Sequence, residues 1–346
     1  MMKCLIIGDR GIPEQCFLEK FKYLEKYDVD FELANLDESM DDAAFYAHLR
    51  KIELEGPEDI KIREDLLKKV EEADIIAVHW TPVNKEFLSR AKKLKILALS
   101  RAGYENVNID VAREKNIWII NAPGRNKEAV ADHAITLFLA ARRRIPLLHS
   151  KIKEGKWETF YPEKDLKNMT AGLIGFGNIG RESAKLLKGL GLKVLVYDPY
   201  ANKNDIIKEG CSYASFNDLL SNSDVILMHA RVSEESKHMI NTQAFKKMKK
   251  KPIFVNNARS LLVDTNALIS ALEEGLISAA ALDVFDEEPL SPNTPLLKFD
   301  NVVLTPHTSN TVQSLMYNGP SIIAKDIEKI LKREKPQYCI LSGREL

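Results

Sequence analysis

The sequence predicts an α/β protein made of two doubly wound parallel-sheet domains with a cleft between them. Short apolar runs of strand length alternate with amphipathic segments of helix length along all 346 residues. Runs such as LKVLVY and DVILMH are apolar without alternation, which is typical of strands buried on both faces of a parallel sheet. The chain is also longer than the roughly 250–300 residues that one hydrophobic core accommodates, so we expect two domains.

The expected strands fall into two groups on either side of a long helical segment. The first group is 3–7, 31–36, 74–78, 95–99 and 118–121. The second group is 171–174, 193–197, 225–228, 253–255, 279–282 and 302–304. Strands separated by helices indicate βαβ units with right-handed crossovers. The segment between the groups predicts a helix over 127–143, whose basic end suits a helix C-terminus and which Pro146 is expected to stop.

Composition and charge exclude several classes of function. The 50 basic and 50 acidic residues give a formal net charge of zero, without the concentrated positive charge that a nucleic-acid partner requires. No apolar run approaches the roughly 20 residues that span a bilayer, and the N-terminal run is too short for a signal peptide. The cysteines at 4, 16, 211 and 339 form no close pair and no metal-binding spacing. We therefore expect a cytoplasmic protein with reduced thiols, no bound metal, no membrane partner and no nucleic-acid partner.

The strongest local motif is the glycine-rich turn GFGNIG at 175–180, between an apolar strand and a helix that begins at Arg181. The first glycine permits the tight turn, the second lets the backbone approach a pyrophosphate, and the third lets the helix pack closely on the strand. The helix N-terminus adds amide donors and a favourable dipole. The residues expected to contact a dinucleotide are Gly175, Phe176, Gly177, Asn178, Ile179 and Gly180. The alternative is an ordinary glycine-rich turn.

An acidic residue after the next strand indicates which dinucleotide is bound. Asp198 follows the strand 193–197, where a carboxylate accepts a hydrogen bond from the adenosine ribose 2′-hydroxyl and repels a 2′-phosphate. Neither Pro199 nor Tyr200 replaces it with a cation. The sequence therefore predicts NAD rather than NADP.

Hydride transfer to or from a carbonyl also needs a cation that polarises the oxygen and an acid/base that moves a proton. Three candidates follow expected strands, at the ends where an α/β sheet binds its ligands: Arg259, Glu288 and His307. Arg259 can hold a carboxylate with two hydrogen bonds, and Glu288 with His307 can form a poised acid/base pair. Taken singly, each has a plainer interpretation: a surface ion pair, a loop carboxylate and a buried, satisfied histidine.

These residues lie in segments that resemble the D-isomer-specific 2-hydroxy acid dehydrogenases. The segments are NNARS at 256–260, LDVFDEEP at 282–289 and LTPH at 304–307, with a 29-residue gap from Arg259 to Glu288. SRAGYENVNID at 100–110, NAPGRNKEAVADH at 121–133 and the glycine-rich turn are similar as well. The resemblance covers nearly the whole chain, and its motifs recur in a fixed order.

The resemblance implies an NAD-dependent oxidoreductase that acts on the CH–OH group of a D-2-hydroxy acid. It implies that Arg259 binds the substrate carboxylate and carbonyl, that His307 is the acid/base, and that Glu288 is its partner. The substrate-binding loop is implied to be Arg101, Ala102, Gly103 and Tyr104. Ala258 and Asp283 are implied as further cofactor contacts, Asp283 at the nicotinamide carboxamide.

The resemblance also implies how the domains are divided. Residues 1–125 and 306–346 are expected to form a discontinuous substrate domain, and 126–305 the NAD-binding domain, both Rossmann-like or flavodoxin-like. Relatives are usually dimers joined through the cofactor domain, so a homodimer is expected, with 126–145 as a candidate interface.

Departures from the family pattern leave the substrate open. Ser260 stands where glycine is usual, and residues 308–310 replace a small glycine-containing segment. Relatives acting on 3-phosphoglycerate tend to have basic residues where this chain has His79-Trp80-Thr81. An indole face and a hydroxyl favour a small polyhydroxylated substrate without a terminal phosphate. Arg10 supplies the alternative, because it would hold a phosphate if its loop faced the cleft.

Two other functions compete with this interpretation. Formate oxidation on the same fold is disfavoured, because that branch has Gln at the position of Glu288. An NAD(H)-sensing binding protein, similar to the co-repressors built on this fold, keeps the same catalytic residues and stays open.

Overall fold

The computed structural model describes residues 1–36, 40–159 and 164–344. The chain divides into two compact units. Unit 1 comprises Met1–Arg125 and Val312–Leu346, and unit 2 comprises Asn126–Thr311. The sequence predicts that the chain returns from the second domain to the first at residue 306. In the structure it returns at Val312, further along the chain than expected. Asp283, inside unit 2, accepts hydrogen bonds from Thr305, Thr308 and Ser309, which ties these residues to unit 2.

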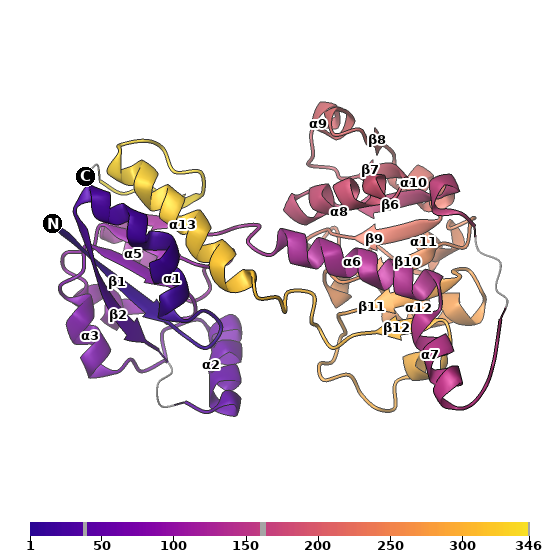
Figure 1. Cartoon of the computed structure of the whole chain (residues 1–346), viewed down its shortest axis with the longest axis horizontal. Coiled ribbons are helices and arrows are strands. Elements are labelled where there is room, and N and C mark those ends of the chain that lie inside the picture. Colours follow the sequence, from indigo (N-terminus) through magenta and orange to yellow (C-terminus); the bar gives the residue numbers. More distant parts are fainter. Residues whose placement is uncertain (37–39, 160–163, 345–346) are drawn as a thin grey trace. The chain divides into compact units, whose positions relative to one another are not determined.

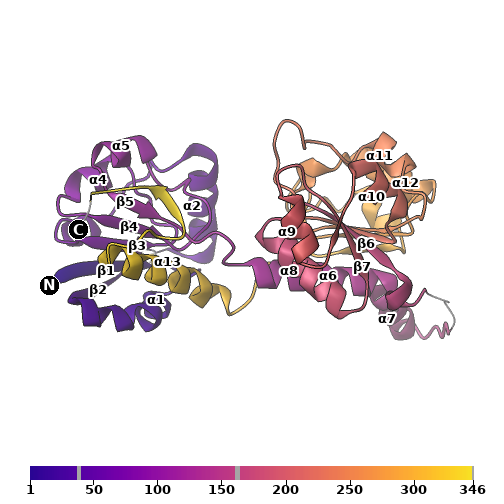
Figure 2. The same ribbon diagram turned by 90° about the horizontal axis from the view of Figure 1, so that it is seen from above.

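Unit 1 contains a six-stranded sheet. Its strands are β1 (Met2–Gly8), β2 (Val29–Asn35), β3 (Ile75–Val78), β4 (Ile96–Leu99), β5 (Trp118–Ile120) and β13 (Cys339–Leu341). The order is β13-β5-β4-β3-β1-β2, and β5 to β2 can be followed across the sheet in Figure 2. The sequence does not predict β13, which pairs antiparallel with β5, so this sheet is not wholly parallel. A three-residue strand at an edge leaves too short a pattern to recognise.

Helices cover both faces of this sheet. They are α1 (Glu14–Phe21), α2 (Asp42–Glu55), α3 (Glu64–Val70), α4 (Lys85–Arg90), α5 (Ile109–Glu114) and α13 (Leu315–Leu331), with the 3-10 helix η1 (Lys22–Tyr27). α3, α4 and α5 pack on one face, and α1, η1 and α13 on the other. α1 and α13 lie side by side although they are far apart in the sequence (Figure 1). Neighbouring residues of β1 enter opposite cores, which explains its continuous apolar run.

Unit 2 contains a seven-stranded, wholly parallel sheet. Its strands are β6 (Thr170–Ile174), β7 (Lys193–Tyr197), β8 (Ser212–Tyr213), β9 (Val225–Met228), β10 (Ile253–Asn256), β11 (Ala279–Leu282) and β12 (Val302–Leu304), in the order β12-β11-β10-β9-β6-β7-β8. Every strand expected from the sequence occurs, and the two-residue edge strand β8 is an addition.

Helices also cover both faces of the unit 2 sheet. They are α6 (Lys127–Arg142), α7 (Ile145–Lys153), α8 (Asn178–Gly189), α9 (Lys203–Lys208), α10 (Phe216–Asn222), α11 (Thr242–Lys246) and α12 (Thr265–Glu273). Short 3-10 helices are η2 (Leu166–Asn168), η3 (Ser260–Leu262) and η4 (Pro295–Lys298). α6 and α8 pack together on one face, and α10, α11 and α12 on the other (Figure 1).

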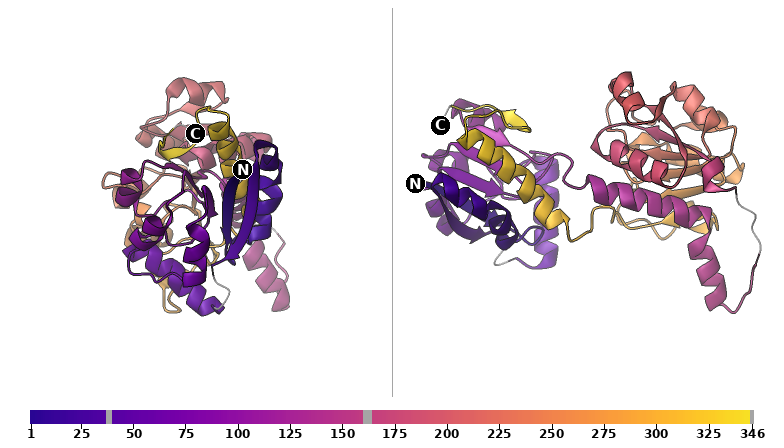
Figure 3. Two further views of the ribbon diagram at one scale, coloured as in Figure 1. Left: turned by 90° about the vertical axis from the view of Figure 1, so that its left-hand side faces the viewer. Right: turned by 45° about the horizontal axis from the view of Figure 1, so that its top comes forward.

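Helix α7 contains no buried residue and projects from the rest of unit 2 (Figure 3). The sequence predicts that Pro146 stops the preceding helix. Instead α6 ends at Arg142, Arg144 adopts a left-handed conformation with φ 50°, and Pro146 occupies the first turn of α7. Proline is tolerated there because the first N–H groups of a helix have no partner within it.

In each sheet, successive strands are added first toward one edge and then toward the other. The change occurs between β1 and β3 in unit 1 and between β6 and β9 in unit 2. In open α/β sheets, ligands bind outside the carboxyl ends of the strands at such a switch point. The unit 1 order is flavodoxin-like apart from the added β13, and the unit 2 order begins as in dinucleotide-binding sheets. These two places are therefore where the candidate residues must be sought.

Within the described ranges, no helix combines the length and apolar character needed to cross a membrane. In the same part of the chain, no group of three or more His, Cys, Asp or Glu side chains is arranged to hold a metal ion. The four cysteines are free; Cys4, Cys16 and Cys211 are buried, and Cys339 is exposed.

Candidate active site

The glycine-rich turn after β6 has the backbone that the sequence predicts. Gly175 has a φ of 103°, which L side chains rarely adopt. A Cβ on Gly180 would lie 2.2 Å from the carbonyl oxygen of Gly175, so the absence of a side chain lets α8 pack closely on the turn. Helix α8 begins at Asn178 rather than at Arg181, which places Gly180 inside its first turn.

The N-terminus of α8 offers amide donors to a ligand. No side chain caps the helix, and the N–H groups of residues 177–180 donate to no acceptor in the part of the chain that the structure describes. A Cβ on Gly177 would meet no atom within 4 Å, so the space beside this residue is open. Free amides and the helix dipole favour an anion, and these residues fit the pyrophosphate of NAD.

Asp198, directly after β7, is bonded to the same turn. Its Oδ2 accepts from the N–H of Phe176 at 2.7 Å, and its Oδ1 accepts from the N–H groups of Tyr200 and Ala201 at 2.8 and 3.1 Å. A carboxylate has about four acceptor positions, so one position is left for a ribose hydroxyl.

His307 and Glu288 form the hydrogen-bonded pair that the sequence predicts. His307 Nδ1 lies 2.8 Å from Glu288 Oε2, and Glu288 Oε1 accepts from the N–H of Phe285 at 3.0 Å. A carboxylate at Nδ1 selects the tautomer protonated there, which leaves Nε2 for proton exchange. The His307 side chain is 47% exposed, so its interpretation as a buried, satisfied histidine is wrong.

Asp283 is buried, and its carboxylate is fully used inside the protein. Oδ1 accepts from Thr305 Oγ1 at 2.5 Å and from the Thr308 N–H at 2.9 Å. Oδ2 accepts from the N–H and Oγ of Ser309 at 2.9 and 2.5 Å. Burial raises the pKa of Asp283, but these hydrogen bonds outweigh it and hold the pKa below its ordinary value. With four donors in place, Asp283 holds the chain on both sides of His307, and its contact with the nicotinamide carboxamide stays a prediction.

Arg259 follows β10 in a loop that Asn256 holds. Asn256 Nδ2 donates to the carbonyl of Arg259 at 2.9 Å, and its Oδ1 accepts from the N–H of Ala258 at 3.1 Å. The Arg259 guanidinium is exposed, and its Nη1 donates to the Ala258 carbonyl at 2.7 Å. Both backbone groups of Ala258 are therefore engaged within the loop. The structure shows no ion pair for Arg259 with any residue it describes, contrary to the plainer interpretation of this side chain.

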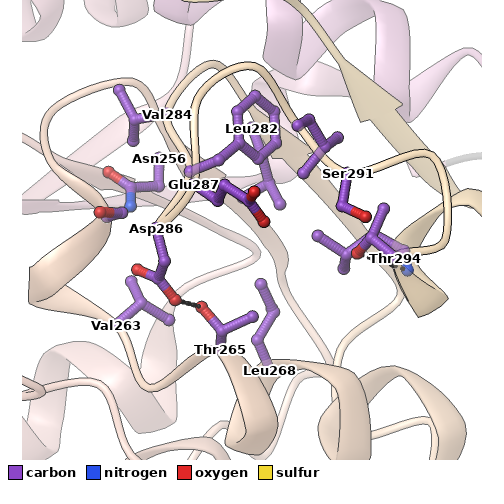
Figure 4. Close-up of a pocket in the computed structure, with 14 residues that line it drawn as sticks. Asn256, Val263, Thr265, Leu268, Leu282, Val284, Asp286, Glu287, Ser291 and Thr294 are labelled. Atoms are coloured by element: carbon purple, nitrogen blue, oxygen red, sulfur yellow. Dashed lines mark hydrogen bonds between the residues drawn. The ribbon is translucent and has the colours of Figure 1, made fainter.

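A cavity of about 150 Å³ lies beneath the loop that leads to Glu288 (Figure 4). Asn256 and Ser260 line it from the Arg259 side, and Asp286 and Glu287 from the Glu288 side. Thr265 Oγ1 donates to Asp286 Oδ2 at 2.6 Å, which ties this loop to helix α12. The loops that carry Arg259 and Glu288 thus both contribute residues to the lining of this cavity.

The predicted substrate loop lies in unit 1, after β4. The N–H groups of Ala102, Gly103 and Tyr104 donate no hydrogen bond to any part of the chain that is described. The loop is held from behind, because Asn121 Nδ2 donates to the Ala102 carbonyl at 2.6 Å. Free, fixed amides of this kind suit a carboxylate.

The surroundings of Arg101 differ from what the sequence indicates. Its guanidinium carbon lies 3.4 Å from the centroid of the Trp80 ring, and its Nη2 donates to Glu105 Oε2 at 2.9 Å. Arg101 therefore covers the indole face that was expected to stack on a substrate, and Thr81 is fully buried. Arg10 donates to the carbonyl of Met40.

The structure thus places Arg259, the His307–Glu288 pair and the glycine-rich turn in unit 2, and residues 101–104 in unit 1. Sequence reasoning missed the Asp283 hydrogen bonds to Thr305 and Ser309. The sequence does show two hydroxyl residues, Thr305 and Ser309, on either side of His307. They could be interpreted only once Asp283 was known to accept a hydrogen bond from both.

Comparison with known proteins adds to this geometry. Residues 135–309 match the family model described as D-isomer specific 2-hydroxyacid dehydrogenase, NAD binding domain. The match includes the glycine-rich turn, Asp198, Arg259, Glu288 and His307.

Two curated relatives and one solved structure are similar to this chain. The D-3-phosphoglycerate dehydrogenase of Archaeoglobus fulgidus is 42% identical over 272 residues, which are 78% of this chain and 52% of that protein, so the chain spans about half of its length. The glyoxylate reductase of Thermococcus litoralis is 38% identical over 284 residues, 80% of this chain and 86% of that protein. The structure of D-2-hydroxyisocaproate dehydrogenase is 26% identical, with a TM-score of 0.76 over 98% of this chain and 99% of that one.

Proposed function

Because this chain belongs to the D-isomer-specific 2-hydroxyacid dehydrogenase family, we propose that it transfers a hydride between NAD(H) and the α-carbon of a small D-2-hydroxy acid or its 2-keto form. The observation that carries the proposal is the 2.8 Å hydrogen bond between His307 Nδ1 and Glu288 Oε2. It supplies a proton carrier on the unit that also holds the free amides of the glycine-rich turn.

In this proposal, His307 moves the hydroxyl proton. Its Nε2 gives a proton to the carbonyl oxygen during reduction and takes one from the hydroxyl group during oxidation. Glu288 fixes the ring and stabilises the imidazolium form, and Asp283 holds the chain around it. NAD supplies or accepts the hydride through its nicotinamide ring when it is bound.

Two groups in this proposal hold the reacting end of the substrate. The planar guanidinium of Arg259 binds the carboxylate and the reacting oxygen with parallel hydrogen bonds and polarises the carbonyl group. The free N–H groups of residues 102–104 receive the carboxylate as well.

We also propose that the protein is a homodimer, joined in part through α7. The support is that α7 and the residue Trp157 beyond it expose apolar side chains: Ile145 is 56%, Ile152 52% and Trp157 82% exposed. Such apolar surface on a projecting helix is typical of an interface. Light scattering of Ile152→Asp should give half the mass of the parent, while Ile207→Asp, changed at a 61% exposed site on α9, keeps the parent's mass. A monomeric parent would contradict the proposal.

A cytoplasmic location without a nucleic-acid partner completes the proposal. The zero net charge and the free cysteines support it. Cell fractionation and a nucleic-acid gel-shift assay test the two parts, and a periplasmic or nucleic-acid-bound protein would contradict them.

The test of the activity is NADH oxidation across a panel of 2-keto acids, followed by chiral analysis of the product. We expect turnover of at least one acid and a product of D configuration. Tight NADH binding without turnover of any acid would favour the NAD(H)-sensing binding protein instead. The names of the relatives, a dehydrogenase and a reductase, support the enzyme.

A further inference from the structure

The carboxyl edge of the unit 1 sheet contains a cluster of buried polar atoms without partners. They are Arg101 Nη1, Arg125 Nη1, His79 Nε2 and Ser100 Oγ. Each comes from the segment after β3, β4 or β5, and so from the end of the sheet where ligands bind, although Arg125 is five residues beyond the end of β5. His79 is at the switch point itself, since β3 is the neighbour of β1.

Arg125 is the member of this cluster whose guanidinium feels the attraction of Asp9 without a direct bond to it. No acid forms an ion pair or hydrogen bond with its guanidinium among the residues that the structure places. Burial, and then repulsion from Arg101, lowers the pKa of Arg125 to about 10, so the group stays charged at neutral pH. Arg125 as a residue is half-buried, but its Nη1 is buried without a partner, and a bound anion is the simplest way to supply one.

Of the acids near the cluster, Glu53 is exposed and bonds to neither arginine, and Asp9 and Glu105 are committed to other donors. Asp9 accepts from the N–H groups of Gly11, Ile12 and Trp80, and from His79 Nδ1 at 2.9 Å. Glu105 is paired with Nη2 of Arg101, not with its Nη1. Each of the two arginines therefore keeps a buried Nη1 donor that no described acceptor reaches.

The fold holds Arg125 firmly in this place. Asn318 Nδ2, on α13, donates to the Arg125 carbonyl at 3.0 Å. A Cβ on the next residue, Gly319, would lie 2.3 Å from Ser100 Oγ and 3.4 Å from Arg125 Cδ. The absence of a side chain at 319 thus gives Ser100 and Arg125 the space in which they lie, and α13 backs the cluster.

We propose that Arg125, with Arg101, binds a second anionic group of the substrate, so that the substrate is a doubly anionic 2-keto or 2-hydroxy acid. The second group is a carboxylate or a phosphate. This inference rests on the proposed function, in which the reacting carboxylate is held by Arg259 and by the amides of residues 102–104. It replaces the expectation of an uncharged polyhydroxylated chain, because Arg101 covers the Trp80 face on which that expectation depended.

The test compares matched substrates in NADH-dependent reduction. Phosphohydroxypyruvate is paired with hydroxypyruvate, and 2-ketoglutarate with 2-ketopentanoate, so that each pair differs in one anionic group. We expect kcat/KM to be at least about tenfold higher for the doubly anionic member of one pair, which identifies the group as phosphate or carboxylate. A parent enzyme that prefers the singly charged member of both pairs overturns the proposal.

Three variants assign the preference to a residue. Arg125→Gln should lower kcat/KM for the doubly anionic acid by about tenfold or more and for its counterpart by less than about threefold. Arg125→Lys keeps the charge and should retain part of the preference. Arg113→Gln, at a 62% exposed arginine of the same unit, should behave as the parent. Equal losses on both members of a pair in Arg125→Gln contradict the assignment.

A binding measurement separates this inference from the proposed function. Inorganic phosphate or malonate should raise the Tm of the parent and not that of Arg125→Gln, relative to sodium chloride at equal ionic strength. Equal shifts in the two proteins overturn the anion site. If no keto acid is turned over, the proposed function fails, and the Tm comparison still decides whether Arg125 binds an anion.

Discussion

Each unit carries a histidine at the same place in its fold, directly after the strand that neighbours the first strand of its sheet. In unit 2 this is His229, after β9, and in unit 1 it is His79, after β3. His229 Nε2 lies 2.9 Å from Ser183 Oγ, a neutral partner on α8. His79 Nδ1 lies 2.9 Å from Asp9 Oδ1, a buried carboxylate.

The hydrogen-bond partners of the two histidines give the two switch points different electrostatic properties. Burial lowers the pKa of His229 to about 4, so its ring stays neutral behind the glycine-rich turn. Burial lowers the pKa of His79 too, but Asp9 opposes the shift and fixes the ring, whose Nε2 joins the unpaired nitrogens of Arg101 and Arg125. Unit 2 therefore presents backbone amides at its switch point, and unit 1 presents charged side chains.

The largest expected effect is the loss of activity on substitution of His307, which is exposed, unlike His79 and His229. His307→Asn should lower kcat by about 10²–10⁴-fold and leave NADH binding unchanged, because only the proton carrier is lost. Asparagine tolerates the left-handed backbone of His307, whose φ is 52°. Steady-state kinetics and NADH fluorescence titration measure the two quantities.

His238 supplies the matched control, because it is exposed and has a φ of 50°. His238→Asn should keep the parent's kcat. A His307→Asn protein with the parent's kcat would remove His307 from the mechanism.

Asp283→Asn should destabilise the protein by about 2–3 kcal/mol, because the new amide cannot accept from the donors that surround one carboxylate oxygen. It should also lower kcat, since the chain around His307 loosens. Urea denaturation and kinetics measure these effects. Asp65→Asn, at an exposed acid of unit 1, is the control for stability. An unchanged free energy of unfolding would show that the four hydrogen bonds do not hold this segment.

Lowering the pH from 7 to 5 should destabilise the parent through His229 by about 2 kcal/mol. The folded protein keeps this ring neutral down to about pH 4, whereas the unfolded chain takes up a proton near the ordinary value of 6.5. The unfolded state therefore binds more protons between these values, and stability rises with pH there. His229→Gln should flatten the pH dependence of the free energy of unfolding, and His79→Gln should flatten it less, because Asp9 opposes the shift of His79. Identical slopes in parent and His229→Gln would remove the distinction between the two histidines.

The smallest expected effect concerns cofactor choice at the unit 2 switch point. Asp198→Asn keeps an oxygen for the Phe176 N–H but removes the charge that repels a 2′-phosphate. The ratio of kcat/KM for NADH over NADPH should fall by about tenfold. A parent that uses both cofactors equally would contradict the role of Asp198.

The strand positions could be predicted from the sequence because buried parallel strands are continuous apolar runs. β8 and β13 escaped prediction because two or three residues at a sheet edge have no such run. The compact units divide at Thr311, five residues after the expected boundary at 306, and no break in composition marks either place, whereas hydrogen bonds to Asp283 tie residues as far as Ser309 to unit 2.

The candidate site divides in the same way. The pairing of His307 with Glu288 followed from motifs with fixed spacing, and the structure confirms it. The stacking role of Trp80 is restricted to one face of its ring, because Arg101, 21 residues further along the chain, lies on the other face. The sequence could not indicate Arg125 as an anion-binding residue. That role depends on its Nη1 being buried without a hydrogen-bond partner, which only the structure shows.

Helix α13 has a consequence for how the protein is made. It supplies Ile323 and Ile327 to the core on one face of the unit 1 sheet, yet it follows all of unit 2 in the chain. A ribosome therefore completes the middle of the polypeptide while the N-terminal sheet still lacks this covering helix and its edge strand β13. Unit 2 can fold during translation, whereas unit 1 must wait with apolar strand residues such as Ile6 and Ala77 incompletely covered, the kind of nascent surface that chaperones bind.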